Sequence, residues 1–447
     1  MTMDQFTKLL LEEAQKAGIE AAEIYLASSD SFRAMCQQGQ INNYTVNTTK
    51  GLSLRGIYQG KMGYAATEAF DESAIAQLVE AVKESAELTE DDDEQEIYKG
   101  DASYPQVENY QPALDQVDET RKMDFILAVE KKAKEMDERI VQLTYNMIST
   151  QSGESRIINT YGLNLSHKDN MAVAVASVMA KEGEKVSTGS GFIVDRDFEK
   201  LNADQIASEA VEEALFMLKA APVPSGTYRA IIHAKCMPDL LGVFSGVFSA
   251  ESAQKGMSLL AGKEGEMIAS EAVTLLDDPL LSGGLASQPF DAEGVATFTK
   301  AIIENGKLTT LLHNLKTAKK AGVKTTGNAA KAGYAGAINV SPSNFYIKPG
   351  EKTLDELMAD MKDGLVITEV SGLHAGANPI SGDFSLIAQG YTVKDGKKDA
   401  AVEQITVAGN FYQLLKNIRV VGSDLCFPGS SVGSPSVDVG EVAVAGK

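Results

Sequence analysis

Histidine is the first residue type to examine for chemistry, because imidazole pairs hold zinc in metal-dependent hydrolases. A helical zinc motif sets two histidines about one turn apart, with a glutamate between them that activates water. None of the four histidines in this chain has another histidine at that spacing: they are His167, His233, His313 and His374. The local sequence therefore predicts no zinc motif, and only a site assembled from distant segments stays open.

A serine or cysteine nucleophile is the second possibility. Residues 429–433 read Gly-Ser-Ser-Val-Gly, which matches the G-x-S-x-G pattern of a nucleophile elbow. Such an elbow lies between a strand and a helix and precedes its histidine, whereas prolines flank this match and no histidine follows Ser431. We therefore expect a structural turn at Ser431. Cys426 is the other candidate nucleophile, and an incidental thiol is the simpler interpretation.

A glycine-rich loop at residues 372–385 gathers polar side chains on a backbone that a ligand can approach closely. Its donors and acceptors are His374, Asn378, Ser381 and Asp383. The loop has no lysine and leads into a strand-like run, so it is not a phosphate-binding loop. Ligand binding and internal satisfaction of these polar groups both remain open at this point.

A second polar stretch, residues 283–298, carries Asp291, Glu293 and Gly294 just before a hairpin pattern. Paired carboxylates serve general acid–base catalysis, but two residues on one strand face form such a pair without any catalytic demand. Turn formation or helix capping is the commoner role of this arrangement. Asn410 directly follows a strand-like run and precedes a helical one, which predicts a helix cap.

The elements that must position these residues begin with a repeated pattern. Residues 3–17 have the apolar period of an amphipathic helix that Gly18 ends, and residues 71–88 are helical with Asp71 as N-cap. Between them lie strand-like runs at 22–28, 41–46, 51–58 and 61–67. The order recurs with helices at 118–137 and 202–220, the latter capped by Asn202, around strand-like runs at 139–150, 155–162, 171–180 and 187–194.

This pattern predicts an α+β protein of two domains. The N-terminal α+β domain spans residues 1–220 and consists of duplicated helix–strands–helix units, with flanking helices on an antiparallel sheet. An acidic linker at about 88–117 joins the units, and its cluster from Glu90 to Glu94 is read as solvated linker rather than a calcium loop. The stretch APVPSG marks the boundary to a strand-rich C-terminal domain, residues 225–447.

Within that second domain, the Asn305-Gly306 and Asp395-Gly396 dipeptides predict hairpins. Helices are expected near residues 315–322 and 353–364. A further helix is expected over residues 238–256, PDLLGVFSGVFSAESAQKG, because Pro238 and Asp239 suit a first turn and Gly256 suits an end. Its middle carries no group that could hold a metal or move a proton.

Composition excludes several classes of function. The 447 residues contain 41 Lys plus Arg against 62 Asp plus Glu, a formal net charge of −21 that repels nucleic acid and anionic membranes alike. Acidic residues near the N-terminus do not suit a signal peptide, and no apolar run is long enough to span a membrane. The three cysteines form no metal or redox spacing, as expected of free thiols in a cytoplasmic protein.

Five segments of the second domain, in order, resemble the TldD/PmbA family, also called modulators of DNA gyrase, and its PmbA (TldE) branch in particular: FDAEGV, KTTGN, GLVITEVSGLHAGANPISGDFS, ITVAGN and IRVVGSD. The resemblance implies a cytoplasmic bacterial metalloprotease made as a TldD–TldE heterodimer, a hydrolase that matures peptides by trimming leader segments. In the catalytic sister, a helix with an H-E-x-x-x-H motif and a C-terminal cysteine hold zinc. Aligned through GKEGEMIAS, that motif falls near residues 241–246, which here read Leu-Gly-Val-Phe-Ser-Gly.

The resemblance thus implies a noncatalytic subunit, with no metal and no catalytic residue in this chain and zinc on a TldD-like partner. It would cover the partner's active site and help hold an extended peptide, with free strand edges adding hydrogen bonds. The residues proposed to line that cleft are Asp291, Glu293, Gly294, His374, Gly376, Asn378, Ser381 and Asp383. Two alternatives stay open: a homodimeric peptide-binding or regulatory protein without proteolytic activity, and a hydrolase that uses Ser431 or Cys426.

Overall fold

The computed structural model describes residues 1–90 and 95–447. Most of the acidic cluster between Glu90 and Glu94, predicted to be solvated linker, therefore lies outside the described residues. In the described part, no helix is both long enough and apolar enough to cross a membrane.

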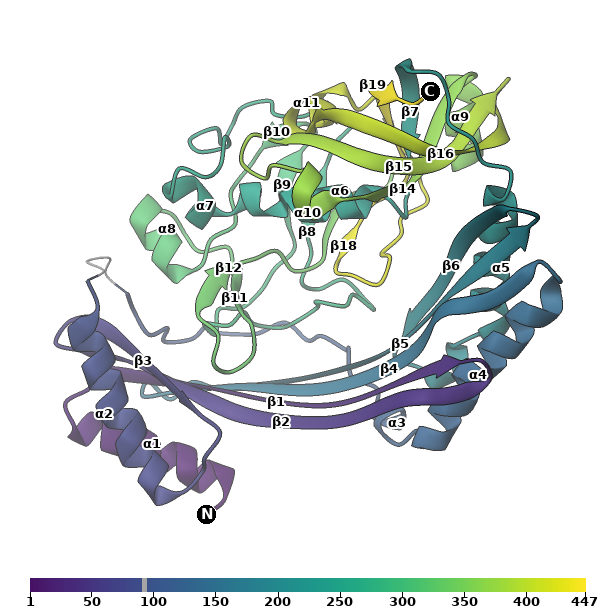
Figure 1. Cartoon of the computed structure of the whole chain (residues 1–447). Helices are drawn as coiled ribbons and strands as arrows, with labels where there is room; N and C mark the ends of the chain where they lie inside the picture. The colour runs from purple at the N-terminus through teal and green to yellow at the C-terminus, as the bar shows by residue number, and fades with distance from the viewer. Residues whose placement is uncertain (91–94) are drawn as a thin grey trace.

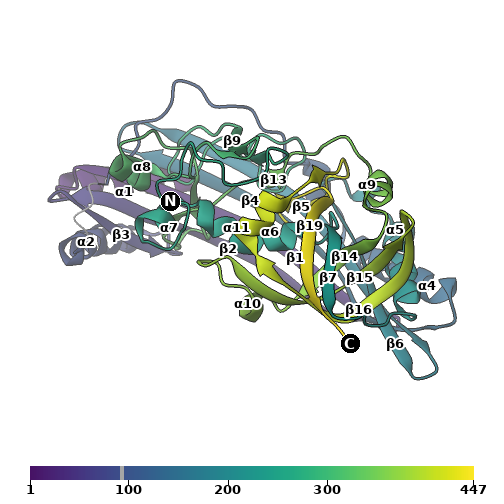
Figure 2. The same ribbon diagram turned by 90° about the horizontal axis from the view of Figure 1, so that it is seen from above.

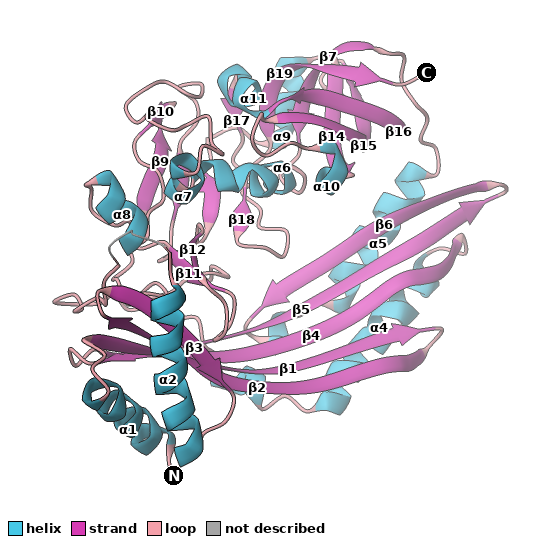
Figure 3. Ribbon diagram, turned by 60° about the vertical axis from the view of Figure 1, so that its left-hand side comes forward, coloured by secondary structure: helices cyan, strands magenta, loops and turns pink. Residues whose placement is uncertain are grey.

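The first half of the chain forms one six-stranded antiparallel sheet, called the large sheet below, with strand order β3-β2-β1-β4-β5-β6. Figures 1 and 3 show its long curved strands, with one pair of helices at each end of one face. The sequence order helix, three strands, helix occurs twice, and β1 pairs with β4 where the two units meet. The strands are β1 (Ala21–Gln37), β2 (Gln40–Tyr58), β3 (Lys61–Thr67), β4 (Ile140–Asn159), β5 (Asn164–Glu182) and β6 (Lys185–Asp195). The helices are α1 (Met3–Lys16) and α2 (Glu72–Leu88) at one end, and α4 (Glu119–Met136) and α5 (Ala203–Met217) at the other.

The predicted helix ends of this half are confirmed. The Asp71 side chain accepts from the Ala74 N–H at the start of α2, and the Asn202 side chain accepts from two N–H groups at the start of α5. Gly18 follows α1 with a φ of 86°, a left-handed conformation that glycine adopts without strain.

The strands are longer than predicted. The runs at 41–46 and 51–58 belong to one strand, β2, and those at 139–150 and 155–162 belong to β4. Glycine at position 51 suggested a break, but Gly51 is continuous in the ladder with Ala27 as its partner. A Cβ there would lie 2.6 Å from the Tyr334 ring, so glycine allows the close approach of a loop from the second half.

The second half contains a six-stranded sheet of order β16-β15-β14-β7-β19-β17, in which β16 also pairs with β19. The sheet thereby closes on itself through three residue pairs. The use of free strand edges to hold a peptide stays a prediction. Its strands are β7 (Gly226–Ile232), β14 (Gly364–Ser371), β15 (Asp383–Lys394), β16 (Lys397–Asn410), β17 (Val420–Val421) and β19 (Val437–Ala445). Seen from above in Figure 2, this sheet lies over the β6 end of the large sheet.

A five-stranded sheet of order β10-β9-β8-β13-β18 and a separate hairpin, β11-β12, complete the second half. The predicted hairpins are confirmed, since Asn305-Gly306 joins β9 to β10 and Asp395-Gly396 joins β15 to β16, with positive φ at all four residues. The strands are β8 (Leu275–Asp277), β9 (Lys300–Glu304), β10 (Lys307–Leu308), β11 (Ala329–Lys331), β12 (Ile338–Val340), β13 (Phe345–Ile347) and β18 (Val432–Gly433).

Short helices join these strands. Helices α8 and α9 confirm the two predictions at 315–322 and 353–364, and Asn410 caps α11 as predicted, by accepting from the Gln413 N–H. The remaining α-helices of the described residues are α3 (Pro112–Asp115), α6 (Met237–Phe244), α7 (Ala250–Gln254), α8 (Leu315–Ala321), α9 (Leu354–Met361), α10 (Leu373–Gly376) and α11 (Phe411–Asn417). The 3-10 helices are η1 (Phe198–Lys200) and η2 (Ser245–Phe248).

Candidate functional site

The helix expected over residues 238–256 is three short pieces rather than one helix. Helix α6 ends at Phe244, η2 takes a tighter turn, and α7 begins anew after Ser249, whose side chain accepts from the Ser252 N–H. Gly242 and Gly246 lower the helix propensity of this stretch, and Ser249 provides a new N-cap. The prediction of a single helix is therefore wrong, although its residues do form helical turns.

The large apolar side chains of α6 are packing groups, whereas Asp239 in its first turn is exposed. Leu240, Leu241 and Phe244 are buried, and the Phe244 ring stacks on Phe411 of α11 with centroids 4.6 Å apart. Gly242, Val243 and Ser245 are half-buried and Gly246 is exposed on the remaining surface. None of these four carries an imidazole, thiol or carboxylate.

An apolar patch on the large sheet lies near the start of α6. It consists of half-exposed side chains on adjacent strands that share the face carrying Tyr25 and Ser155: Met147, Val173, Val175, Phe192 and Val194. Lys235, two residues before α6, places its Nζ 5.7 Å from the Phe192 ring centroid. The start of α6 and the patch therefore face one another.

The loop at residues 372–383 forms a compact polar network. Asn378 Oδ1 accepts from the N–H groups of Ile380 and Ser381, and Ser381 Oγ donates to Asp383 Oδ2 at 2.8 Å. Asn410 Nδ2 donates to Asp383 Oδ1 at 2.9 Å, and these hydrogen bonds hold the pKa of Asp383 below its usual value. His374 and Asn378 remain exposed, while Gly376 packs its backbone against the Ser385 carbonyl. The loop is thus internally ordered and still presents polar groups to solvent.

Asp291, Glu293 and Gly294 lie instead in a buried turn that contacts the large sheet. Asp291 accepts three backbone hydrogen bonds, from Glu293, Val295 and Ala329, at 2.9–3.1 Å. Burial raises the pKa of Asp291, and the nearby charge of Glu293 adds to that effect. Gly294 has a φ of 81°, and its carbonyl accepts from the Tyr104 hydroxyl.

Glu293 completes a buried charge cluster that links the two halves. Arg55 of β2 donates to Glu23 of β1 at 2.7 Å and to Glu293 at 3.3 Å, and all three side chains are less than one-tenth exposed. Glu293 also accepts from the Leu315 N–H at the start of α8. Burial by itself would lower the pKa of Arg55, but the two carboxylates more than offset this and raise it.

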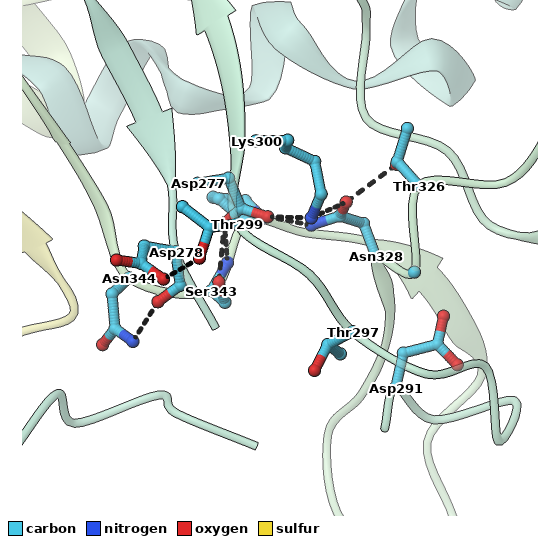
Figure 4. A network of polar contacts seen from close by, with 12 residues as sticks. Asp277, Asp278, Asp291, Thr297, Thr299, Lys300, Thr326, Asn328, Ser343 and Asn344 are labelled. Carbon is cyan, nitrogen blue, oxygen red and sulfur yellow. Dashed lines mark hydrogen bonds and ion pairs between the residues drawn. The ribbon is translucent and has the colours of Figure 1, made fainter. Parts of the chain in front are cut away.

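A second buried carboxylate fixes the loops around Asp291, as Figure 4 shows. Asp277 accepts from Lys300 Nζ at 2.8 Å, from Asn328 Nδ2 at 2.7 Å, and from the N–H and hydroxyl of Ser343. A buried carboxylate with four donors is fully satisfied. Because Asn328 is adjacent to Ala329, this network also positions the backbone donor to Asp291.

The predicted site residues therefore form two separate groups. Within residues 1–90 and 95–447, no hydrogen bond or ion pair joins the turn of Asp291, Glu293 and Gly294 to the loop at 372–383. Sequence reasoning missed Glu23, Arg55 and Lys331, which lie beside the first group. A charged residue in an otherwise apolar strand pattern, as in GLSLRGIY, was the available signal, since such a charge needs a buried partner.

Comparison with known proteins places this architecture in a class of metallopeptidase domains. Three family models match: PmbA/TldA metallopeptidase domain 1 over residues 22–86, the central domain over 112–218 and the C-terminal domain over 225–446. This chain belongs to the PmbA/TldD family.

Individual relatives agree with that assignment over nearly the whole chain. A metalloprotease of Methanothermobacter thermautotrophicus is 28% identical over 91% of this chain and 88% of its own, and metalloprotease PmbA of Escherichia coli is 26% identical over 98% and 96%. A modulator of DNA gyrase from Thermotoga maritima has 34% identity and a TM-score of 0.93, covering 99% of this chain and all of the other. TldE from Thermococcus kodakarensis, at 23% identity and a TM-score of 0.90, covers 98% and 100% and shares the fold.

The metal that a metallopeptidase family implies does not fit the residues around α6. His233 Nδ1 accepts a hydrogen bond from the Lys235 N–H at 3.1 Å, and Cys236 is fully buried, which raises the pKa of its thiol well above the usual value. A zinc ligand is a free imidazole nitrogen, a thiolate or a carboxylate oxygen. Throughout the described residues, no group of three or more His, Cys, Asp or Glu side chains is arranged to hold a metal.

Proposed function

We propose that this chain is the noncatalytic, PmbA/TldE-type subunit of a two-chain metalloprotease that processes peptides. Zinc and the water-activating glutamate belong to a TldD-type partner in this proposal, and the complex works in the cytoplasm. The observation that carries the proposal is the composition of α6. The segment aligned with the zinc motif, residues 241–246, consists of Leu241, Phe244 and four small or aliphatic residues, and the side chains of Leu241 and Phe244 are part of the core.

Two features of the chain support a role in holding a peptide. The apolar patch offers half-exposed aliphatic side chains and one aromatic ring to the apolar residues of an extended peptide. The loop at 372–383 presents His374, Asn378 and Asp383 on an ordered backbone, which favours polar contacts to the peptide or the partner.

Asp291, Glu293 and Gly294 play a different part in this proposal. Their polar atoms make hydrogen bonds and an ion pair within the chain, and these contacts hold the turn that faces the large sheet. A ligand could reach this group only through the cavity that Asp291 lines. The loop at 372–383 is therefore the stronger candidate for direct peptide contact.

The test is to purify this chain alone, a TldD-type chain from the same organism alone, and the two together. Zinc is measured by elemental mass spectrometry, and cleavage of an unstructured peptide is followed by chromatography. We expect no stoichiometric zinc in the isolated chain, cleavage by the mixture, and loss of that cleavage when the partner's motif glutamate is replaced by glutamine.

Chelator-sensitive cleavage by the isolated chain, together with one tightly held metal per molecule, would overturn the proposal. If the chain instead forms a stable homodimer that binds peptides and gains no activity with any histidine-bearing sister, the regulatory alternative replaces it. Loss of a cleavage activity on changing Ser431 or Cys426 to alanine would point to a nucleophilic hydrolase. The raised pKa of the Cys426 thiol, caused mainly by burial, argues against that last outcome.

A further inference from the structure

Lys331 is a lysine held between two aromatic rings where the halves of the molecule meet. Its Nζ lies 4.7 Å from the ring centroid of Tyr25 on β1 and 4.8 Å from that of Tyr64 on β3. The amine also donates a hydrogen bond to the Ser53 hydroxyl on β2. Three strands of the large sheet therefore fix the position of this amine, although the lysine itself belongs to β11.

No carboxylate neutralises Lys331 by direct contact in the described part of the chain. The charged groups that act on its pKa are Arg55, which repels a second cation, and Glu23, which already accepts from Arg55. Asp291 lines the same cavity, and its oxygens already accept three backbone hydrogen bonds. Tyr25 and Tyr64 face the amine as neutral phenols, because burial raises the pKa of both.

These surroundings favour the neutral amine. Burial lowers the pKa of Lys331 to about 7, the repulsion from Arg55 adds to the effect, and Glu23 partly opposes it. A lysine of this kind has an unprotonated, nucleophilic nitrogen near neutral pH, whereas an exposed lysine is almost wholly protonated.

Lys331 is also one of the residues that line a cavity of about 210 Å³, whose lining comes from both halves of the chain. Tyr25 and Ser155 of the large sheet form one side, and Gln288, Asp291 and Lys331 contribute from the second half. At about 30 Å³ per water molecule, the space equals roughly seven waters. A compact ligand with few non-hydrogen atoms fits a space of this size.

We infer that Lys331 is the nucleophilic amine of a small-molecule site, and that the cavity accepts a small uncharged aldehyde, which condenses with Nζ to a reversible imine. This site is separate from peptide processing and does not depend on the proposed function. The ionisable acid and base that line the cavity are Asp291 and Lys331, one of each sign, and this balance favours an uncharged ligand.

The reaction is a condensation without redox change. The Nζ lone pair forms a bond to the carbonyl carbon, and the carbonyl oxygen takes up a proton, which gives a carbinolamine. The carbon–oxygen bond then breaks, the oxygen leaves as water with both amine protons, and a carbon–nitrogen double bond remains. Water reverses the sequence and releases the aldehyde.

The experiment uses the full chain and propanal, with cyanoborohydride to reduce any imine to a stable amine, followed by peptide mass spectrometry. At pH 7.5 we expect Lys331 to be modified faster than the exposed Lys324 by on the order of tenfold or more. The rate should saturate as propanal is increased, and should rise between pH 6 and 8 with a midpoint near 7. Modification of Lys331 no faster than Lys324, or a rate that never saturates, would overturn the inference.

Two variants sharpen the result. Lys331→Arg keeps a long nitrogen-bearing side chain between the tyrosine rings and removes the nucleophile, so the fast saturable phase should vanish. Lys324→Arg is the matched control and should retain it. Because site mapping on the unmodified chain decides the question by itself, a Lys331→Arg variant that fails to fold leaves the test intact.

Discussion

The surroundings of α6 are apolar, whereas the joint between the two halves contains buried charges. Around α6, the chain buries Leu241, Phe244 and Phe411 in one apolar core, where the rings of Phe244 and Phe411 stack. At the joint, Glu23, Arg55 and Glu293 are buried as charges and Lys331 lies between two rings. Helix α6 thus packs into an apolar core, and the buried charges lie at the joint.

This difference predicts which substitutions should lower the stability of the protein most, and by which mechanism. A packed apolar helix loses stability in proportion to the volume removed, whereas a buried charge cluster loses stability when one charge is left without its partner. The two regions can therefore be separated by matched variants.

The largest effect is expected at Arg55. Changing Arg55→Met strands the carboxylates of Glu23 and Glu293 in a buried site, and the free energy of unfolding should fall by about 3–5 kcal/mol in urea titrations. Arg121→Met is the control, because its ion pair with Glu199 is exposed and should cost less than about 1 kcal/mol. Equal effects of the two changes would mean that the buried cluster is not the interaction that joins the halves.

The next effect is expected within α6. Leu241→Ala removes a fully buried side chain and should lower the free energy of unfolding by about 2–4 kcal/mol. Val243→Ala, on the half-exposed surface of the same helix, should cost distinctly less. Similar losses at both positions would contradict the packing role assigned to the buried side of α6.

A smaller, pH-dependent effect is expected at Lys331. Because the folded-state pKa is lowered to about 7, the unfolded chain binds the extra proton between pH 7 and about 10, and the contribution of Lys331 to stability rises with pH across that window. Urea titrations at pH 7 and 9.5 should show this rise in the unmodified chain and its loss in Lys331→Met. The exposed Lys324→Met variant should behave like the unmodified chain, and a rise that persists in Lys331→Met would have another source.

The smallest effect on stability, and a distinct effect on function, is expected in the loop at 372–383. Asp383→Ala removes an exposed side chain whose partners are Ser381 and Asn410, so the thermal midpoint should stay close to that of the unmodified chain. Peptide cleavage by the mixture with the TldD-type partner should nevertheless fall. Unchanged cleavage would remove this loop from the peptide-contacting surface.

The joint between the halves and the loop at 372–383 also show how much of the site could be predicted from the sequence. The caps at Asp71, Asn202 and Asn410 and both hairpins depend on residues a few positions apart, and all were predicted correctly. Strand length was not predicted correctly. In the sequence Gly51 indicates the end of a strand, whereas in the fold it allows the close approach of Tyr334.

The sequence by itself determined most local elements, the family and the apolar composition of α6, because each depends on residues that lie close together in the sequence. Only the tertiary structure decided that the β16–β19 pairing closes the second sheet and that Asp291 and His374 belong to separate groups. It alone brought Lys331 to Tyr25, Tyr64 and Arg55. The physical reason is that ring contacts and charge effects act over a few ångströms, between residues that the chain keeps hundreds of positions apart.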